Sequence, residues 1–205
     1  MSHREPFFEP LPAPATPEAP GERTYTDLPW QVPVNVVGVT VALRLGLARD
    51  HDTLVVLGHA VVYDRGVCLT VETWVRPGTE LDEMVHGWQA LRPRFGILLD
   101  DGTRVGHDPN AEWDPAHDTQ AAGIVQVDGS AGLLTTSTTW WLYPFPQGHA
   151  LEIVVTWPAR GIEECFTHLD LAQLRAACDL AEPLWPLPAA REDPAGGSAG
   201  GAAHG

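Results

Sequence analysis

The amino-acid sequence predicts a mainly β fold. We expect an antiparallel β-sandwich, Ig-like or jelly-roll-like, with a C-terminal α-helix packed on it and a short second helix near residues 80–91. Three observations predict it. Apolar residues recur with a period of two along most of the middle of the chain. Turn residues separate about eight short runs of this kind. One amphipathic segment with a helical period follows the last run, which is typical of a sandwich with a helix packed on it.

The first strands lie between residues 37 and 75. From Val37 the residues alternate, so that one face carries Val39, Val41, Leu43, Leu45 and Leu47, and the other carries Thr40, Ala42, Arg44 and Gly46. A second apolar run covers residues 53–63 and is followed by a turn at 64–66. Residues 67–75 then form its partner strand, in which Trp74 shares a face with Cys68, Thr70, Glu72 and Arg76.

The later strands follow the same rules. Residues 95–99 and 103–105 form a hairpin around Asp101-Gly102, because this dipeptide favours the positive φ of a two-residue turn. Further strands are expected over 124–127, 134–143, 151–157 and 163–169.

Two segments have a helical period. The first follows Thr79, a suitable N-cap, and its apolar residues are Leu81, Met84, Val85, Trp88 and Leu91. The second begins at Asp170 as N-cap with Gln173 three residues later, close to a capping box. Its apolar stripe is Leu171, Leu174, Cys178 and Ala181.

The ends of the chain differ from its middle. Residues 1–28 are acidic and carry prolines at 6, 10, 12, 14, 17 and 20, so we expect a disordered, partly polyproline-II arm. Residues 189–205 are rich in Gly and Ala, which predicts a disordered tail. Residues 29–188 are left as a single β-sandwich domain, long enough to bury a sizeable core.

Charge and cysteine usage restrict the function classes. The chain has 12 basic and 27 acidic residues and a formal charge of −15, which disfavours nucleic acids and anionic membranes as partners. Three cysteines without a C-x-x-C spacing disfavour both a disulfide framework and a zinc ribbon. The first residues lack a signal-peptide pattern, and no run approaches the ~18 apolar residues of a membrane span. We therefore expect a cytoplasmic protein.

Several short patterns resemble those of a known family. They are Phe95-Gly96 with Asp101-Gly102-Thr103-Arg104, then Trp141, Pro144, Pro146, Trp157-Pro158-Ala159, Gly161-Ile162, Glu164, Asp170 and Leu184-Trp185-Pro186. Together they resemble a family of small, uncharacterised actinobacterial proteins over most of residues 32–186. The chain departs from that family at residues 128–132, where the family has a longer glycine tract. The resemblance implies no activity.

The pair Trp140-Trp141 stands in a predicted strand that Pro144 and Pro146 end. Neighbours in a strand point to opposite faces, so one indole belongs between the sheets and the other on the outer face. The outer indole is either covered by the helix or a loop, or forms an exposed aromatic platform together with Trp74. The candidate binding residues are Trp140, Trp74, Trp141 and Tyr143.

A second cluster lies in residues 105–118. Imidazoles and carboxylates together can bind zinc, iron or manganese, but no pair has helical i, i+4 spacing, and Pro109 and Pro115 interrupt the run. A mobile acidic loop is therefore favoured over a metal site. The metal-ligand candidates are His107, Asp108, Glu112, Asp114, His117 and Asp118.

Motifs of catalysis are weak throughout. There is no G-x-S-x-G elbow and no phosphate-binding glycine loop, and the cysteines fall at predicted buried positions or without a neighbouring base. The leading hypothesis is a non-enzymatic module that binds a protein or peptide partner and needs no cofactor. The alternatives are a small-molecule or carbohydrate binder that uses exposed tryptophans, and a metal-dependent hydrolase centred on residues 107–118. The sequence sets neither the strand order nor the oligomeric state.

Overall fold

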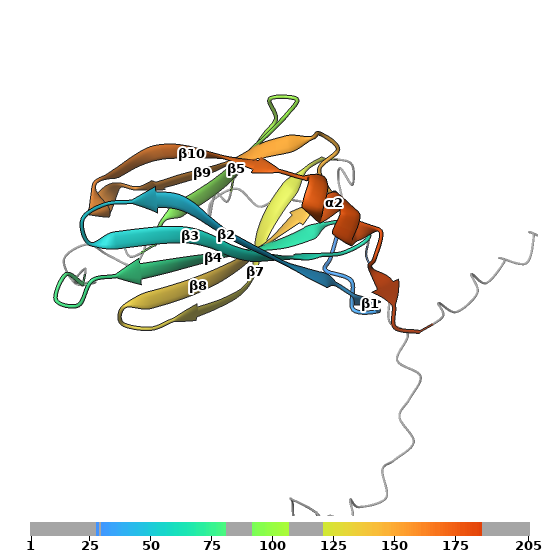
Figure 1. The fold of residues 1–205 in the computed structure, drawn as a ribbon, viewed down its shortest axis with the longest axis horizontal. Coiled ribbons are helices and arrows are strands. Elements are labelled where there is room, and N and C mark those ends of the chain that lie inside the picture. Colours follow the sequence, from blue (N-terminus) through green and yellow to red (C-terminus); the bar gives the residue numbers. More distant parts are fainter. Residues whose placement is uncertain (1–27, 29, 81–91, 107–120, 186–205) are drawn as a thin grey trace, which may run out of the picture.

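The computed structural model describes residues 28, 30–80, 92–106 and 121–185. The fold is mainly β, and all strand pairs are antiparallel (Figure 1). The strands are Val36–Val37 (β1), Val39–Arg49 (β2), Thr53–Val62 (β3), Val67–Val75 (β4), Arg94–Leu99 (β5), Arg104–Gly106 (β6), Gly123–Ala131 (β7), Thr135–Tyr143 (β8), Ala150–Trp157 (β9), Ile162–Asp170 (β10) and Glu182–Pro183 (β11). The helical elements within these described residues are the 3-10 turn Pro158–Arg160 (η2) and the α-helix Ala172–Cys178 (α2).

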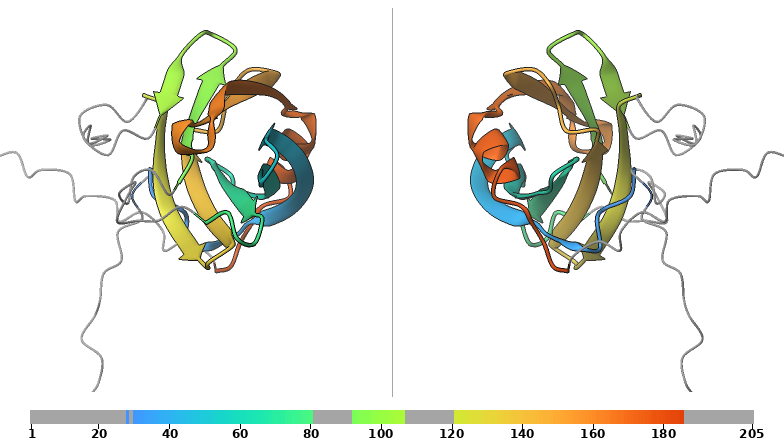
Figure 2. Two further views of the ribbon diagram at one scale, coloured as in Figure 1. Left: turned by 90° about the vertical axis from the view of Figure 1, so that its left-hand side faces the viewer. Right: turned by 90° about the vertical axis from the view of Figure 1, so that its right-hand side faces the viewer.

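The strands form two main sheets. A five-stranded sheet has the order β2-β3-β4-β8-β7, and a four-stranded sheet has the order β10-β9-β5-β6. The strands β1 and β11 form a small third sheet. At the margins, β10 lies against β2 and β6 against β7, so the two main sheets curve around one shared interior (Figure 2). The predicted mainly β, antiparallel architecture is confirmed, and its Ig-like or jelly-roll-like type stays a prediction.

The alternation expected along the first long strand is present in β2. The side chains at odd positions from Val39 to Leu47 are at least partly buried, and those at even positions from Thr40 to Gly46 are exposed. The period ends at a register shift between Gly46 and Ala48, where β2 holds one residue more than β3. Leu47 and Ala48 are consequently both buried.

One hydrophobic core fills the space between the sheets. It includes Leu57 and Leu69 from the five-stranded sheet and Ile97 and Ile153 from the four-stranded sheet, all at most 2% exposed. Removing this apolar surface from water is the main stabilising contribution to such a fold.

Helix α2 packs against β2 and β3 beside this core. Leu171 and Leu174 are fully buried, as their place in the predicted stripe requires. The helix begins one residue later than the sequence predicts, because β10 extends to Asp170 and Leu171 becomes the N-cap residue. The Asp170 carboxylate still accepts a hydrogen bond from the Ala172 amide at 2.7 Å. The sequence-predicted helix near residues 80–91, the arm and the Gly/Ala tail fall outside the described residues, apart from Leu28 and Glu80.

Candidate functional site

Trp140 and Trp141 point to opposite faces of β8, as strand alternation predicts. Trp140 is 6% exposed and lies in the core between the sheets, where its ring stacks on Phe95 with centroids 5.5 Å apart and planes 13° from parallel. Trp141 is 0% exposed and belongs to a separate cluster with Cys68 and Tyr143. The bulge in this part of the sheet lies in β7, so it leaves the alternation of β8 intact.

The outer indole is covered by the segment that precedes β1. Trp30 and Val32 pack on the Trp141 cluster, and Trp141 Nε1 donates a hydrogen bond to the Trp30 carbonyl at 2.9 Å. Tyr63 closes another side with an edge-to-face contact of 5.7 Å. We call residues 30–32 the covering segment.

Of the two alternatives for the outer indole, the structure shows the one in which a loop covers it, and the exposed platform at Trp140, Trp141 and Tyr143 is wrong. The three side chains are 6%, 0% and 9% exposed. The physical reason is that Trp140 fills the core while the covering segment removes the outer indole from water. The sequence carried a signal for this, since Trp30 and Val32 are apolar residues directly after the Pro-rich arm.

Trp74 differs from the other three candidates. It is 41% exposed, near the end of β4, where it pairs in register with Leu54 on β3 and Thr135 on β8. It lines a hollow of about 360 Å³ together with residues 49–54, Val75 and Arg76. We call this hollow and its lining residues the Trp74 end.

The turn between β2 and β3 shapes the Trp74 end. The Asp50 carboxylate accepts hydrogen bonds from the backbone amides of Asp52 and Thr53, both at 2.7 Å. These bonds satisfy amides that the sheet ladder leaves unpaired and so fix the turn. His51 and Asp52, which belong to this turn, line the hollow.

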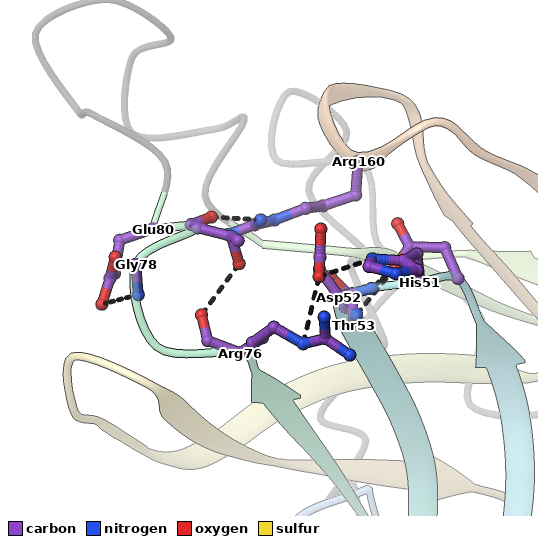
Figure 3. Close-up of polar contacts among 9 residues, drawn as sticks. His51, Asp52, Thr53, Arg76, Gly78, Glu80 and Arg160 are labelled. Carbon is purple, nitrogen blue, oxygen red and sulfur yellow. Dashed lines mark hydrogen bonds and ion pairs between the residues drawn. The ribbon is translucent and has the colours of Figure 1, made fainter.

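Asp52 joins this turn to the end of β4 (Figure 3). Its Oδ1 atom lies 2.8 Å from His51 Nδ1 and 3.3 Å from Arg76 Nε. Its backbone carbonyl also accepts a hydrogen bond from the Arg76 amide at 2.8 Å. The carboxylate thus orients an imidazole and a guanidinium beside the exposed indole.

The loop after β4 extends this network to the other sheet. The Thr79 hydroxyl donates to the Arg76 carbonyl at 2.8 Å, and Arg160 donates to the Thr79 carbonyl (Figure 3). The Arg160 guanidinium also lies 5.6 Å from the centre of the Trp157 ring. Hydrogen bonds from the backbone amides of Glu80 and Gly78 lower the pKa of the Glu80 carboxyl. The Trp74 end is therefore supported by both sheets.

The described side chains that line the Trp74 end include a candidate general base but no exposed hydroxyl and no thiol. The His51 side chain is 80% exposed and pairs with Asp52, an arrangement that could orient a general base. The adjacent Thr53 also lines the hollow, but its side chain is 3% exposed and its Oγ1 atom is buried. Burial raises the pKa of the Cys68 thiol to about 12, and burial also raises the pKa of Cys178. Such thiols are poor nucleophiles at neutral pH.

The metal-ligand candidates His107, Asp108, Glu112, Asp114, His117 and Asp118 all lie outside the described residues. Among the residues that are described, no group of three or more His, Cys, Asp or Glu side chains is placed to hold a metal ion. The metal-dependent hydrolase stays a prediction.

Sequence reasoning missed the convergence of His51, Asp52, Trp74 and Arg76. A signal was available in the strand pairing. Thr53 pairs with Val75, so Asp52 and Arg76 are the next residues at the same end of the antiparallel ladder. Pairing the two runs in that register would have placed the carboxylate beside the guanidinium.

Comparison of the chain with protein-family models, curated proteins and solved structures finds no match. The resemblance to small actinobacterial proteins therefore stays a prediction. Within the described ranges, no helix has the length and apolar character needed to cross a membrane.

Proposed function

We propose that this protein is a non-enzymatic cytoplasmic module that binds a protein or peptide partner through the Trp74 end. The observation that carries the proposal is a half-exposed tryptophan in a hollow that Arg49 and Arg76 also line. Trp and Arg are, with Tyr, the side chains enriched among residues that dominate binding energy at protein interfaces. The cytoplasmic location rests on the three cysteines, all of which are free thiols.

The surroundings of the hollow fit an interface with an apolar centre and a polar rim. Leu133, in the turn between β7 and β8, is 81% exposed. Its neighbour Leu134 accepts a hydrogen bond from the Val75 amide at 2.8 Å, so this turn lies beside the end of β4. His51 and Asp52 supply the polar rim. A partner segment could place an apolar side chain against Trp74 and Leu133, and charged or neutral hydrogen-bonding groups against His51 and Asp52.

The test compares the full chain with its Trp74→Ala variant. Partners are captured from native lysate, identified, purified and then titrated against each protein by calorimetry. Truncating an aromatic anchor of an interface costs about 2 kcal/mol or more, so we expect the dissociation constant to rise about 30-fold. Val125→Ala is the matched control, because Val125 is 37% exposed on β7. Equal affinity for the wild type and Trp74→Ala would refute the proposal.

A carbohydrate ligand is the second candidate, and a specific observation favours it. The exposed face of Trp74 lies in one hollow with His51, Asp52 and Arg76, whose nitrogen and oxygen atoms can both donate to and accept from hydroxyl groups. A panel of mono- and oligosaccharides is titrated while tryptophan fluorescence is recorded. A saturable shift that disappears in Trp74→Ala would favour a sugar over a peptide.

A further inference from the structure

Four residues on neighbouring strands of the four-stranded sheet form a row on its outer face, and two of the four are glycines. Gly106 on β6 pairs with Gly96 on β5, Gly96 pairs with Val154 on β9, and Val154 pairs with Phe166 on β10. The neighbouring residues in these strands, Ile97, Val105 and Ile153 among them, point into the core. The row therefore faces outward by alternation. In Figure 1 this sheet forms the layer of β10, β9 and β5 on the side away from β3 and β4.

Beside this row the sheet surface is hollowed. The next row runs from Arg104 through Leu98 and Glu152 to His168. Leu98, Glu152 and His168 line a hollow of about 300 Å³ that reaches the hairpin after β5. Phe166, which is 54% exposed, lies next to it. We call the glycine row and this hollow together the outer groove.

The glycines at the floor of the outer groove leave room for an approaching chain. A Cβ atom placed on Gly106 would meet nothing within 4 Å, and one placed on Gly96 would meet the Val105 carbonyl no closer than 3.4 Å. Neither residue has the left-handed φ that would require glycine. Glycine inside a strand, such as Gly96 in β5, often marks a bulge, a bend or a place where a ligand or another backbone comes close.

The β5–β6 side of the outer groove carries two arginines, Arg94 and Arg104, whereas the hollow beside the glycine row is lined by the carboxylates of Asp100 and Glu152. Arg94 and Arg104 are both exposed. Among the described residues, neither forms an ion pair. Two such guanidiniums beside an apolar floor favour an occupant that combines aromatic and acidic side chains.

The N-terminal arm has this composition. Phe7 and Phe8 stand between Glu5 and Glu9, and residues 1–27 carry five acidic against two basic residues. Prolines on both sides favour an extended polyproline-II segment, which binds in apolar grooves at a low entropic cost. Residues 1–27 lie outside the described part of the chain, and Leu28 is its first residue.

The arm is long enough to reach the outer groove. Phe8 and Leu28 are 20 positions apart in the chain. At roughly 3.1 Å per residue this stretch spans about 60 Å when extended, whereas a domain of this size is about 40 Å across. The connection therefore does not restrict which face the arm can contact.

We propose that the Phe7-Phe8 segment docks in the outer groove of its own chain. The two rings lie over Gly96, Gly106 and Val154 beside Phe166. Glu5 and Glu9 pair with Arg94 and Arg104. This surface is separate from the Trp74 end, so the proposal does not depend on the proposed function.

The test is photo-cross-linking of the full chain with p-benzoylphenylalanine in place of Phe8. The cross-linked peptides are located by mass spectrometry, and the same residue in place of Ala19 is the control. We expect cross-links from position 8 to fall within residues 94–106 and 150–170, and cross-links from position 19 to be weaker there. Cross-links spread evenly over the surface, or concentrated at residues 49–54 and 74–76, would overturn the proposal.

Two substitutions test the groove itself. Gly106→Leu fills its floor without a steric clash, and Phe166→Ser removes its aromatic wall. Each is expected to lower the yield from position 8 about tenfold, because each changes one part of the groove and leaves the other contacts in place. Unchanged yields in both variants, with thermal melts showing that both are folded, would contradict the docking.

Charge reversal tests the predicted ion pairs. A mixture of isotope-labelled chains tests whether the docked arm belongs to the same chain or to another copy. Arg94→Glu with Arg104→Glu should lower the yield, and adding Glu5→Arg with Glu9→Arg should restore it. Restoration is expected only if the arm and the groove pair directly. An equal mixture of ¹⁴N and ¹⁵N chains should give cross-links within single chains, and mixed-isotope products would contradict docking of the arm on its own chain.

Discussion

The contact between Trp141 and the covering segment gives a quantitative prediction. Trp141→Phe keeps an aromatic ring in the cluster but removes the 2.9 Å hydrogen bond to the Trp30 carbonyl. Losing that bond costs about 1 kcal/mol, because the Trp30 carbonyl is left without a donor. The smaller ring leaves a space in a site that is 0% exposed, which adds about 1–2 kcal/mol. We expect the free energy of unfolding to fall by about 2–3 kcal/mol.

The assay is urea denaturation of the full chain followed by circular dichroism, with thermal melts as a second measure. For a chain of this size each kcal/mol lowers the melting temperature by about 2–4 °C. Trp30→Ala is the control, because it removes the covering side chain and keeps the carbonyl that accepts the bond. The double variant gives the coupling between the two residues. A loss below about 0.5 kcal/mol in Trp141→Phe would refute the conclusion that the covering segment buries Trp141.

Three further predictions concern single positions. Gly66→Ala should destabilise the fold by about 1–3 kcal/mol, because a Cβ atom there would lie 2.7 Å from the Leu142 carbonyl. Gly46→Ala is the control and should have little effect, since a Cβ atom there would meet nothing within 4 Å. Equal melting temperatures for the two variants would contradict this prediction. Burial raises the pKa of Cys68 from 9.0 to about 12. The stability that the protonated thiol contributes is therefore complete below pH 9 and should be lost as the pH rises towards 12. The free energy of unfolding, measured over this range, should depend less on pH in Cys68→Ala. Asp50→Ala leaves the amides of Asp52 and Thr53 without an acceptor and should cost about 1–2 kcal/mol in urea denaturation; an unchanged midpoint would show that the turn does not need the carboxylate.

The sequence was most informative where local rules decide the structure. The period of two located the strands between residues 39 and 170, with ends that differ from the structure by at most four residues. The same rule placed Trp140 and Trp141 on opposite faces. Both results follow from the backbone geometry of a strand, which does not depend on what packs against it.

The exposure of each indole could not be obtained in this way. Trp141 is buried because residues 30–32 return over it from a position 111 residues earlier in the chain. Trp74 stays half exposed because it lies at the end of β4, beside a turn and away from that segment. Whether a strand face is covered is a tertiary property, and alternation alone carries no information about it.

The Trp74 end illustrates the same limit for a site. Its residues come from the β2–β3 turn and from the end of β4, and each segment alone is an ordinary turn or strand end. They meet because the β3–β4 register sets Thr53 opposite Val75. The charge and composition of the chain restricted the class of partner but did not locate the surface.

Residue-resolved oxidative footprinting tests the central claim that the Trp74 end is the recognition surface. The full chain is exposed to hydroxyl radicals alone and in complex with a partner captured as described above, and oxidation of each tryptophan is measured by mass spectrometry. We predict that Trp74 is oxidised much faster than Trp140 and Trp141 in the free protein and becomes protected in the complex. Rapid oxidation of Trp140 or Trp141, or an unchanged rate at Trp74 in the complex, would contradict the account.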